Sequence, residues 1–224
     1  MTITLIILGM IVLAFHIVEK VKKYTVKAVI LKSIVSVLFV AVAVTAGPDA
    51  PLTKLVIVGL VCGLLGDIWL DLKHIFPEYD KTFLYAGFAA FGVGHILYVT
   101  GLLAQYGAGW FLVGSLVLAC LAAGLVLAME KPMKLKYGKM KPVIALYGFL
   151  LFCTVFVSGG LLIRDGGAQL VMFFAGSVLF AASDLVLSGT YFGTGKKLPI
   201  HIISNLILYY AGQFMIAASL GLLG

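Results

Sequence analysis

Three ionisable residues stand inside long apolar runs of the sequence, where charged side chains are uncommon. Asp67 lies in LLGDIWL, Asp184 in AASDLVL and Lys32 in VILKSIV. An ionisable side chain is costly to keep in a membrane-like segment, so it marks a functional site by default. Carboxyl and amine groups in such places serve either as acids and bases in catalysis or as carriers in proton-coupled transport. The residue types alone leave both chemistries open.

The composition is that of a membrane protein. Of the 224 residues, 62% are hydrophobic and 11% are charged, whereas an average soluble domain has about 45–50% apolar and about 25% charged residues. One membrane-crossing helix needs roughly 20 apolar residues, so eight would fill most of the chain and leave no room for a soluble domain. We therefore predict a single transmembrane domain over residues 1–224. Its predicted spans are Thr2–Val18, Ala28–Thr45, Leu55–Leu72, Thr82–Ala104, Gly109–Met129, Pro142–Ile163, Ala168–Ser188 and Pro199–Leu222.

The fold class follows from the needs of the backbone. N–H and C=O groups in lipid must find partners within the protein, which leaves helices and closed barrels as spanning structures. The eight runs lack the alternation of barrel strands, so we predict an all-α integral membrane bundle of eight transmembrane helices. The first run begins almost at Met1 with no basic stretch before it, so we expect a permanent span rather than a cleaved signal.

The basic residues predict how the bundle sits in the lipid bilayer of the cell membrane. Thirteen of the 16 Lys and Arg lie in the first, third, fifth and seventh connections, two lie in the other three, and Lys32 lies within a span. Basic connections stay in the cytoplasm, so both termini are predicted to face the non-cytoplasmic side. The net charge of +7 then reflects topology, and we exclude nucleic acid as a partner. Lys73, Lys81, Lys196 and Lys197 at this end could also attract an anionic headgroup.

Four polar residues fall at one depth when the helical rise is counted from the cytoplasmic ends of the spans. At about 1.5 Å per residue, Lys32, Asp67, Asp184 and Asn205 all lie about 8–10 Å inside. Polar residues tolerated at random would scatter in depth, so this agreement predicts one pocket that faces the cytoplasmic leaflet. Asp71 shares a helix face with Asp67, either as a catalytic group or as a charge at the membrane interface.

The last span carries a polar stripe, since His201, Asn205, Tyr209 and Gln213 follow at four-residue steps. Residues four apart share a face of a helix. The stripe therefore either lines the interior pocket or only bonds to neighbouring helices. His95 would lie about 21 Å inside, past the bilayer centre, where a structural and a functional role are equally open.

Small residues and cysteines favour packing rather than chemistry. Gly59 with Gly63, and Ala90 with Gly94, have the four-residue spacing of closely packed membrane helices. The three cysteines lie inside apolar runs without metal-ligand spacing, so we predict packing roles for them and no metal site. The similar segments GDIWL (66–70) and SDLVL (183–187) point to a four-plus-four duplication of the helices.

The order of these motifs resembles that of the YhhN family, whose members include lysoplasmalogenases, over essentially the whole chain. One position departs from the family pattern, because Ser33 rather than proline follows Lys32. The residues that carry the resemblance are Lys32, Asp67 in GDIWL, the series Gly87, Phe91, His95 and Tyr98, Asp184 in SDLVL, and the closing pair Tyr209 and Gln213.

The resemblance implies an integral membrane hydrolase that cleaves the vinyl ether of a lysoplasmalogen, or of a related ether lysolipid, to a fatty aldehyde and a glycerophospho-alcohol. Protonation of the alkene gives an oxocarbenium ion that water captures, so one carboxyl group must donate a proton while another stays ionised. Asp67 and Asp184 are the implied catalytic pair, with their roles unassigned, and no cofactor or metal is required. The implied substrate-binding residues are Lys32, Asp71, His95, Tyr98, Asn205, Tyr209 and Gln213.

The residues leave two other classes of function open. A proton-coupled transporter of a small solute or lipid would also use intramembrane Asp, Lys and His, and a four-plus-four repeat suits alternating access. The polar cluster is predicted near one leaflet rather than at the midplane, which favours the hydrolase. A scaffold or a receptor would leave Asp67, Asp184 and Lys32 without a role. No oligomeric state follows from the motifs.

Overall fold

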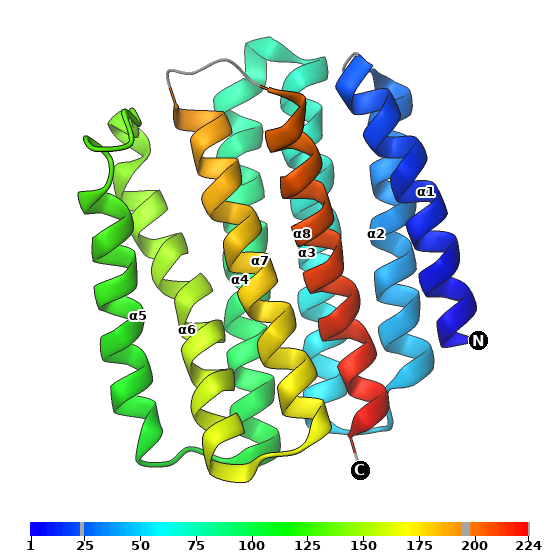
Figure 1. Cartoon of the computed structure of the whole chain (residues 1–224), viewed down its shortest axis with the longest axis vertical. Coiled ribbons are helices and arrows are strands. Elements are labelled where there is room, and N and C mark those ends of the chain that lie inside the picture. Colours follow the sequence, from blue (N-terminus) through cyan, green and yellow to red (C-terminus); the bar gives the residue numbers. More distant parts are fainter. Residues whose placement is uncertain (23–24, 194–197, 224) are drawn as a thin grey trace.

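The computed structural model describes residues 1–22, 25–193 and 198–223, and they form a bundle of eight long helices (Figure 1). Each of these helices is long and apolar enough to cross a membrane. The chain is a multi-pass membrane protein, and the predicted fold class is confirmed. Lys196 and Lys197 lie outside the described residues. The helices are α1 (Thr2–Lys22), α2 (Val26–Ala46), α3 (Pro51–Ile75), α4 (Asp80–Tyr106), α5 (Phe111–Ala128), α6 (Lys141–Asp165), α7 (Ala168–Phe192) and α8 (Pro199–Ser219), with 3-10 turns η1 (Pro77–Tyr79), η2 (Gly138–Met140) and η3 (Leu220–Leu222).

Local sequence explains several helix ends. Pro51 and Pro199 open α3 and α8, where the missing N–H of proline needs no partner. The Thr25 side chain caps α2 by accepting a hydrogen bond from the Ala28 backbone, as N-cap residues do. Helices α4 and α6 end at glycines 107 and 166, which have φ of 75° and 68°, a conformation that residues with a side chain rarely adopt.

The helices pair in the same way in the two halves of the chain. In the first half α1 packs on α2 and α3 runs along α4, and in the second half α5 packs on α6 and α7 runs along α8. The halves meet where α2 contacts α8 and where α4 contacts α6. The first helix of each half, α1 or α5, is the least buried. This arrangement agrees with the duplication that the two similar pentapeptides suggest.

Glycines let the paired helices approach closely, as predicted for the first half. A Cβ atom on Gly94 would lie 3.0 Å from the carbonyl oxygen of Gly59. The second half has a similar crossing, where a Cβ on Gly176 would lie 2.8 Å from the carbonyl oxygen of Gly212. The packing role predicted for cysteine is wrong for Cys120, which is exposed on α5.

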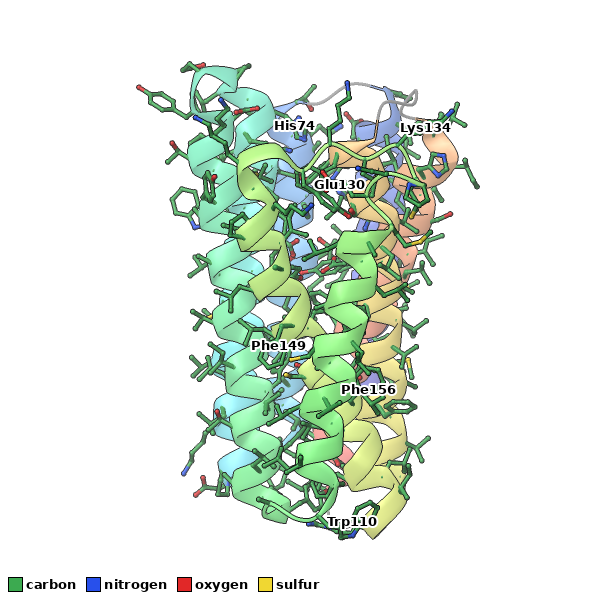
Figure 2. The ribbon with its side chains drawn as sticks, turned by 90° about the vertical axis from the view of Figure 1, so that its left-hand side faces the viewer. His74, Trp110, Glu130, Lys134, Phe149 and Phe156 are labelled. Carbon is green, nitrogen blue, oxygen red and sulfur yellow. The ribbon has the colours of Figure 1, made fainter. Side chains whose placement is uncertain are left out.

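The two ends of the bundle differ in charge. The connections with most of the lysines gather at one end, where Figure 2 shows His74, Glu130 and Lys134, while Trp110 lies at the other. Both chain termini lie at the end opposite the lysines (Figure 1). Which side of the membrane each end faces stays a prediction.

Candidate active site

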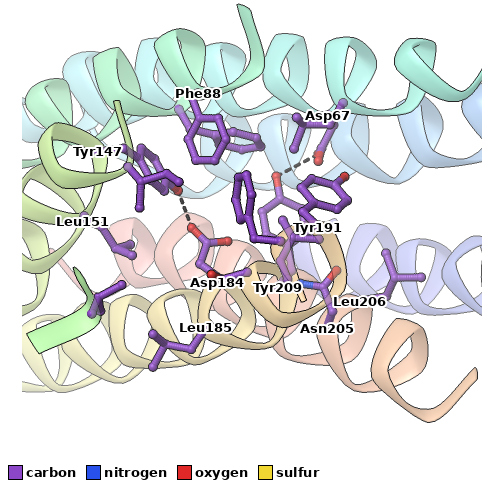
Figure 3. Close-up of a pocket in the computed structure, with 18 of the residues that line it drawn as sticks. Asp67, Phe88, Tyr147, Leu151, Asp184, Leu185, Tyr191, Asn205, Leu206 and Tyr209 are labelled. Carbon is purple, nitrogen blue, oxygen red and sulfur yellow. Dashed lines mark hydrogen bonds between the residues drawn. The ribbon is translucent and has the colours of Figure 1, made fainter. Parts of the chain in front are cut away.

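A cavity within the bundle brings together the two aspartates predicted to be catalytic. Asp67 and Asp184 both line it, and so do Lys32, Asn205 and Tyr209 (Figure 3). The cavity contains about 930 Å³ of space free of atoms, its open mouth included. The four residues predicted to share one depth therefore lie on one cavity.

Asp67 lies in a charged, fully bonded environment. Its side chain is 2% exposed, and the Lys32 ammonium is 3.0 Å from its Oδ1. Its Oδ2 accepts hydrogen bonds from the Ser36 hydroxyl at 2.6 Å and from the Tyr209 hydroxyl at 2.7 Å. A cation and two hydroxyl donors together compensate the negative charge of a buried carboxylate.

A chain of hydrogen bonds behind Asp67 fixes the Tyr209 hydroxyl. The Tyr98 hydroxyl donates to Gln213 Oε1 at 3.3 Å, and Gln213 Nε2 donates to the Tyr209 oxygen at 3.2 Å. Tyr98 and Gln213 are not among the described residues that line the cavity. The structure therefore places both of them where they support Asp67 through Tyr209.

Asp71 extends the charge network away from the cavity. It is fully buried, and its Oδ1 lies 3.3 Å from Lys32 Nζ and 3.2 Å from Lys20 Nζ. The charges therefore alternate from Lys20 through Asp71 and Lys32 to Asp67. Asp71 does not line the cavity, and its burial contradicts the alternative of an exposed charge at the membrane interface.

Asp184 has a different environment, without a counter-ion. The Tyr147 hydroxyl donates a short hydrogen bond to its Oδ2 (Figure 3), and the Ser183 hydroxyl lies 3.5 Å from its Oδ1. Within the described part of the chain, no Lys, Arg or His nitrogen lies within ion-pair distance of this carboxyl. Asn205 supports the helix beside it, because its Nδ2 donates to the Ser183 carbonyl at 2.9 Å.

Neither His95, predicted to bind substrate, nor His201, the first residue of the polar stripe, hydrogen-bonds to either aspartate within the described part of the chain. His95 Nδ1 is 3.0 Å from the Thr154 hydroxyl, and the His95 ring packs edge-on against Phe180. His95 is buried, but it is not among the residues described as lining the cavity. His201 is exposed, so the polar stripe of α8 is internal at Tyr209 but not at its first residue.

Three residues that contact the acids escaped the sequence prediction. Ser36 stands one helical turn after Lys32, so its position on the same face was a usable signal. Tyr147 had no such signal, because it lies alone in an apolar run. The assignment of Lys20 to the first connection is wrong, since α1 continues to Lys22 and carries the Lys20 side chain, 9% exposed, onto the cavity wall.

Apolar side chains of α4, α5 and α6 form one side of the cavity wall. Their chemistry suits a hydrocarbon chain, because burying apolar surface is favourable without directional contacts. In the described residues, no group of three or more His, Cys, Asp or Glu side chains is arranged to hold a metal ion. The main apolar lining residues are Phe88, Val126, Ile144, Leu151 and Phe152.

The fold and the cavity define a class of protein, a multi-pass helical membrane protein with two carboxyl groups on one internal cavity. Within that class, residues 27–220 match the model of the YhhN family, and the chain belongs to this family. No curated protein and no solved structure matches the chain.

Proposed function

We propose that the protein is a membrane hydrolase that cleaves the vinyl ether bond of a lysoplasmalogen or a related ether lysolipid. The products are a fatty aldehyde and a glycerophospho-alcohol. The supporting observation is that two carboxyl groups on one cavity have unlike partners, since Asp67 pairs with Lys32 whereas the partners of Asp184 among the described residues are hydroxyl groups. Two unlike carboxyl groups suit vinyl ether hydrolysis, one as the proton donor and one as a negative charge that stabilises the cation.

In this proposal Asp184 is the acid. A carboxyl with hydroxyl partners and no counter-ion can bear a proton without leaving a buried cation unpaired. Asp184 transfers this proton to the alkene carbon that is not bonded to oxygen, and the positive charge spreads over the other alkene carbon and the ether oxygen. The Asp67 carboxylate, held by Lys32, Ser36 and Tyr209, stabilises this oxocarbenium ion from the cavity wall.

Water then completes the reaction. A water molecule adds to the cationic carbon and gives one proton to the Asp184 carboxylate, which regenerates the acid. The product is a hemiacetal. It collapses as its hydroxyl proton moves to the departing glycerol oxygen, the carbon–oxygen bond to glycerol breaks, and the aldehyde forms. The net change is the consumption of one water molecule.

The remaining lining would bind the substrate. The alkyl chain lies along the apolar side chains of α4, α5 and α6, and enters laterally from the cytoplasmic leaflet. Asn205 and Lys32 face the glycerol portion. Tyr147 acts as a positioning residue, since its hydroxyl holds the Asp184 carboxyl.

The test is a substrate panel with detergent-solubilised, purified protein. Choline and ethanolamine lysoplasmalogens are compared with the matching ester lysophospholipids, and release of aldehyde and of fatty acid is measured separately. Release of aldehyde from the alkenyl lipids, without release of fatty acid from the ester lipids, supports the proposal. Fatty acid release would instead indicate an esterase. Absence of hydrolysis together with solute uptake in sealed vesicles would favour proton-coupled transport, which cannot be observed without two compartments.

A further inference from the structure

A second, smaller cavity adjoins the first, at the end of the bundle that carries most of the lysines. Lys20, Leu187, Tyr191 and Asn205 line both cavities. One ligand can therefore occupy the two cavities at once, with its reactive part beside the aspartates and another part beyond Tyr191 and Asn205.

The polar lining of the second cavity consists of hydrogen-bond donors. No Asp or Glu is present among the described residues of its wall. Ammonium, imidazole, hydroxyl and amide groups can all donate hydrogen bonds, and together they favour an anionic ligand, above all a phosphate with its several acceptor oxygens. The polar lining residues are Lys20, His74, Thr190, Tyr191, His201 and Asn205.

The basic groups of this cavity are fixed by their neighbours. Lys20 Nζ lies 3.2 Å from Asp71, at the outer end of the ion chain that leads to Asp67. On the other side, Lys73 Nζ lies 3.4 Å from the centre of the Tyr191 ring, and the His74 ring packs edge-on against the same ring. Lys20 and His74 therefore lie in the wall of the second cavity, and Lys73 lies beside Tyr191, which lines both cavities.

The order of the walls matches the order of groups in an ether lysolipid. Apolar residues of α4 to α6 form one side of the first cavity, the two aspartates follow, and the second cavity lies beyond, between α1, α3, α7 and α8. Figure 3 shows Leu151 and Tyr147 on one side of Asp184, and Tyr191 and Asn205 on the other. In the lipid, the alkyl chain, the vinyl ether, the glycerol and the phosphate follow in the same order.

We propose that the second cavity binds the phosphate ester of the glycerophospho headgroup, with Lys20 as the main cation and His74 and His201 as further donors. This proposal rests on the proposed function, because it assigns the headgroup end of the same substrate. A phosphate ester of glycerol could reach the site as part of the lysolipid or as a free, water-soluble ester. The experiments below distinguish the two sources.

The first experiment separates KM from kcat on two substrates, a lysoplasmalogen and the 1-alkenylglycerol that lacks phosphate. Lys20→Met and His201→Gln should each raise KM for the lysoplasmalogen about 10- to 100-fold, as expected for loss of a charge-assisted hydrogen bond, with little change in kcat. Kinetics of His201→Gln on the 1-alkenylglycerol should stay as in the wild type, and Lys20→Met, which also alters the ion network behind Asp67, should lose more on the lysoplasmalogen than on the 1-alkenylglycerol. Equal losses on both substrates would overturn the phosphate site.

A matched control is Lys22→Met. Lys22 is an exposed lysine on the same helix that lines neither cavity, so its removal should leave KM unchanged on both substrates. His201→Gln guards against misfolding, because His201 is exposed and, unlike Lys20, makes no ion pair with another described residue. Unchanged KM in a folded His201→Gln and a folded Lys20→Met variant would overturn the proposal.

The second experiment does not depend on hydrolysis. Calorimetric titration of sn-glycerol 3-phosphate into wild-type protein in detergent should show saturable binding that Lys22→Met keeps and that Lys20→Met weakens about 10-fold or more. Displacement of the ester by a non-hydrolysable ether lysophospholipid supports the headgroup assignment, and failure to displace it overturns that assignment. Phosphate binding at Lys20 without any aldehyde release would refute the hydrolase alone, whereas hydrolysis without such binding would refute the phosphate site alone.

Discussion

The two halves of the bundle place an aspartate at corresponding positions, yet give the two carboxyl groups opposite electrostatic environments. Asp67 on α3 and Asp184 on α7 each follow the start of a similar pentapeptide on the third helix of a half. The second helix of each half supplies the partner, which is Lys32 on α2 for Asp67 and Tyr147 on α6 for Asp184. The difference therefore arises from the neighbouring helices and not from the motif.

In the proposed hydrolysis, this asymmetry would let two similar motifs take two distinct roles. Two carboxyl groups with the same neighbours would compete for the same protonation state. A lysine beside one of them and a tyrosine hydroxyl beside the other separate the roles, in the way that paired carboxyl groups divide acid and charge-stabilising functions in glycosidases. Variants that act on one half at a time test this difference between the two carboxyl groups.

The largest expected effect is on turnover, from Asp184→Asn. Loss of the proton donor should lower kcat for aldehyde release by about 100- to 10,000-fold. The thermal midpoint should change little, because the amide that replaces the carboxyl leaves no charge unpaired. Coupled detection of the aldehyde and thermal unfolding in detergent measure the two quantities.

Asp49→Asn is the matched control, since Asp49 is 84% exposed at the opposite end of the bundle. It should keep wild-type turnover. Near-normal aldehyde release by a folded Asp184→Asn variant would contradict the assignment of the acid.

Asp67→Asn should differ from Asp184→Asn, because it should also weaken the fold. It leaves Lys20 and Lys32 opposite the single carboxylate of Asp71 in the buried network. Removal of one partner of a buried ion pair costs about 3–5 kcal/mol, so the thermal midpoint should fall clearly, and turnover should fall about 100-fold or more.

The double variant Lys32→Met with Asp67→Asn restores the balance of charge in this network. It should recover most of the lost stability and none of the activity. Equal stability of Asp67→Asn and Asp184→Asn would show that the two environments do not differ as described.

The close glycine contacts between helices allow the packing of the two halves to be compared. Gly176→Ala would put a methyl group 2.8 Å from the Gly212 carbonyl oxygen, and Gly94→Ala would put one 3.0 Å from the Gly59 carbonyl oxygen. Backbone atoms cannot rotate away, so each change should destabilise the protein by about 1–3 kcal/mol, more for Gly176. Thermal unfolding measures this, and Gly114→Ala on α5, where nothing lies within 4 Å, should be neutral.

The smallest expected effect concerns Glu130, a glutamate that does not line the cavity of Asp67 and Asp184. Glu130, in the connection before α6, accepts hydrogen bonds from Lys141 Nζ at 2.7 Å and from the Tyr137 backbone at 3.1 Å, which lower its pKa. A carboxyl group whose pKa is lower in the folded state stabilises the fold at pH values above the ordinary glutamate pKa of 4.5. This contribution is lost as the pH falls through the pKa of the folded state.

When the pH is lowered from about 6 to about 3, the Glu130→Gln variant should therefore lose slightly less thermal stability than the wild type. Its turnover at neutral pH should match that of the wild type. A loss of activity comparable with that of Asp184→Asn would show that carboxyl groups at the surface matter as much as the two internal ones.

The number and order of the helices and the segregation of basic residues to one end could be predicted from the sequence. Hydropathy and helix-ending residues act locally, so eight spans could be counted without knowledge of their packing. The rise along a helix is equally local, which is why Lys32, Asp67, Asp184 and Asn205 were expected at one level and do line one cavity.

Only the tertiary structure decided which of these groups touch. Depth along a helix says nothing of the direction in which a side chain points, and that direction depends on how each helix is rotated and packed. For this reason Tyr147 bonds to Asp184 without any signal in the sequence, His95 turns toward Thr154, and Lys20 reaches Asp71 across the helix boundary. The unlike environments of two similar motifs are thus a property of contacts between helices that are distant in the sequence.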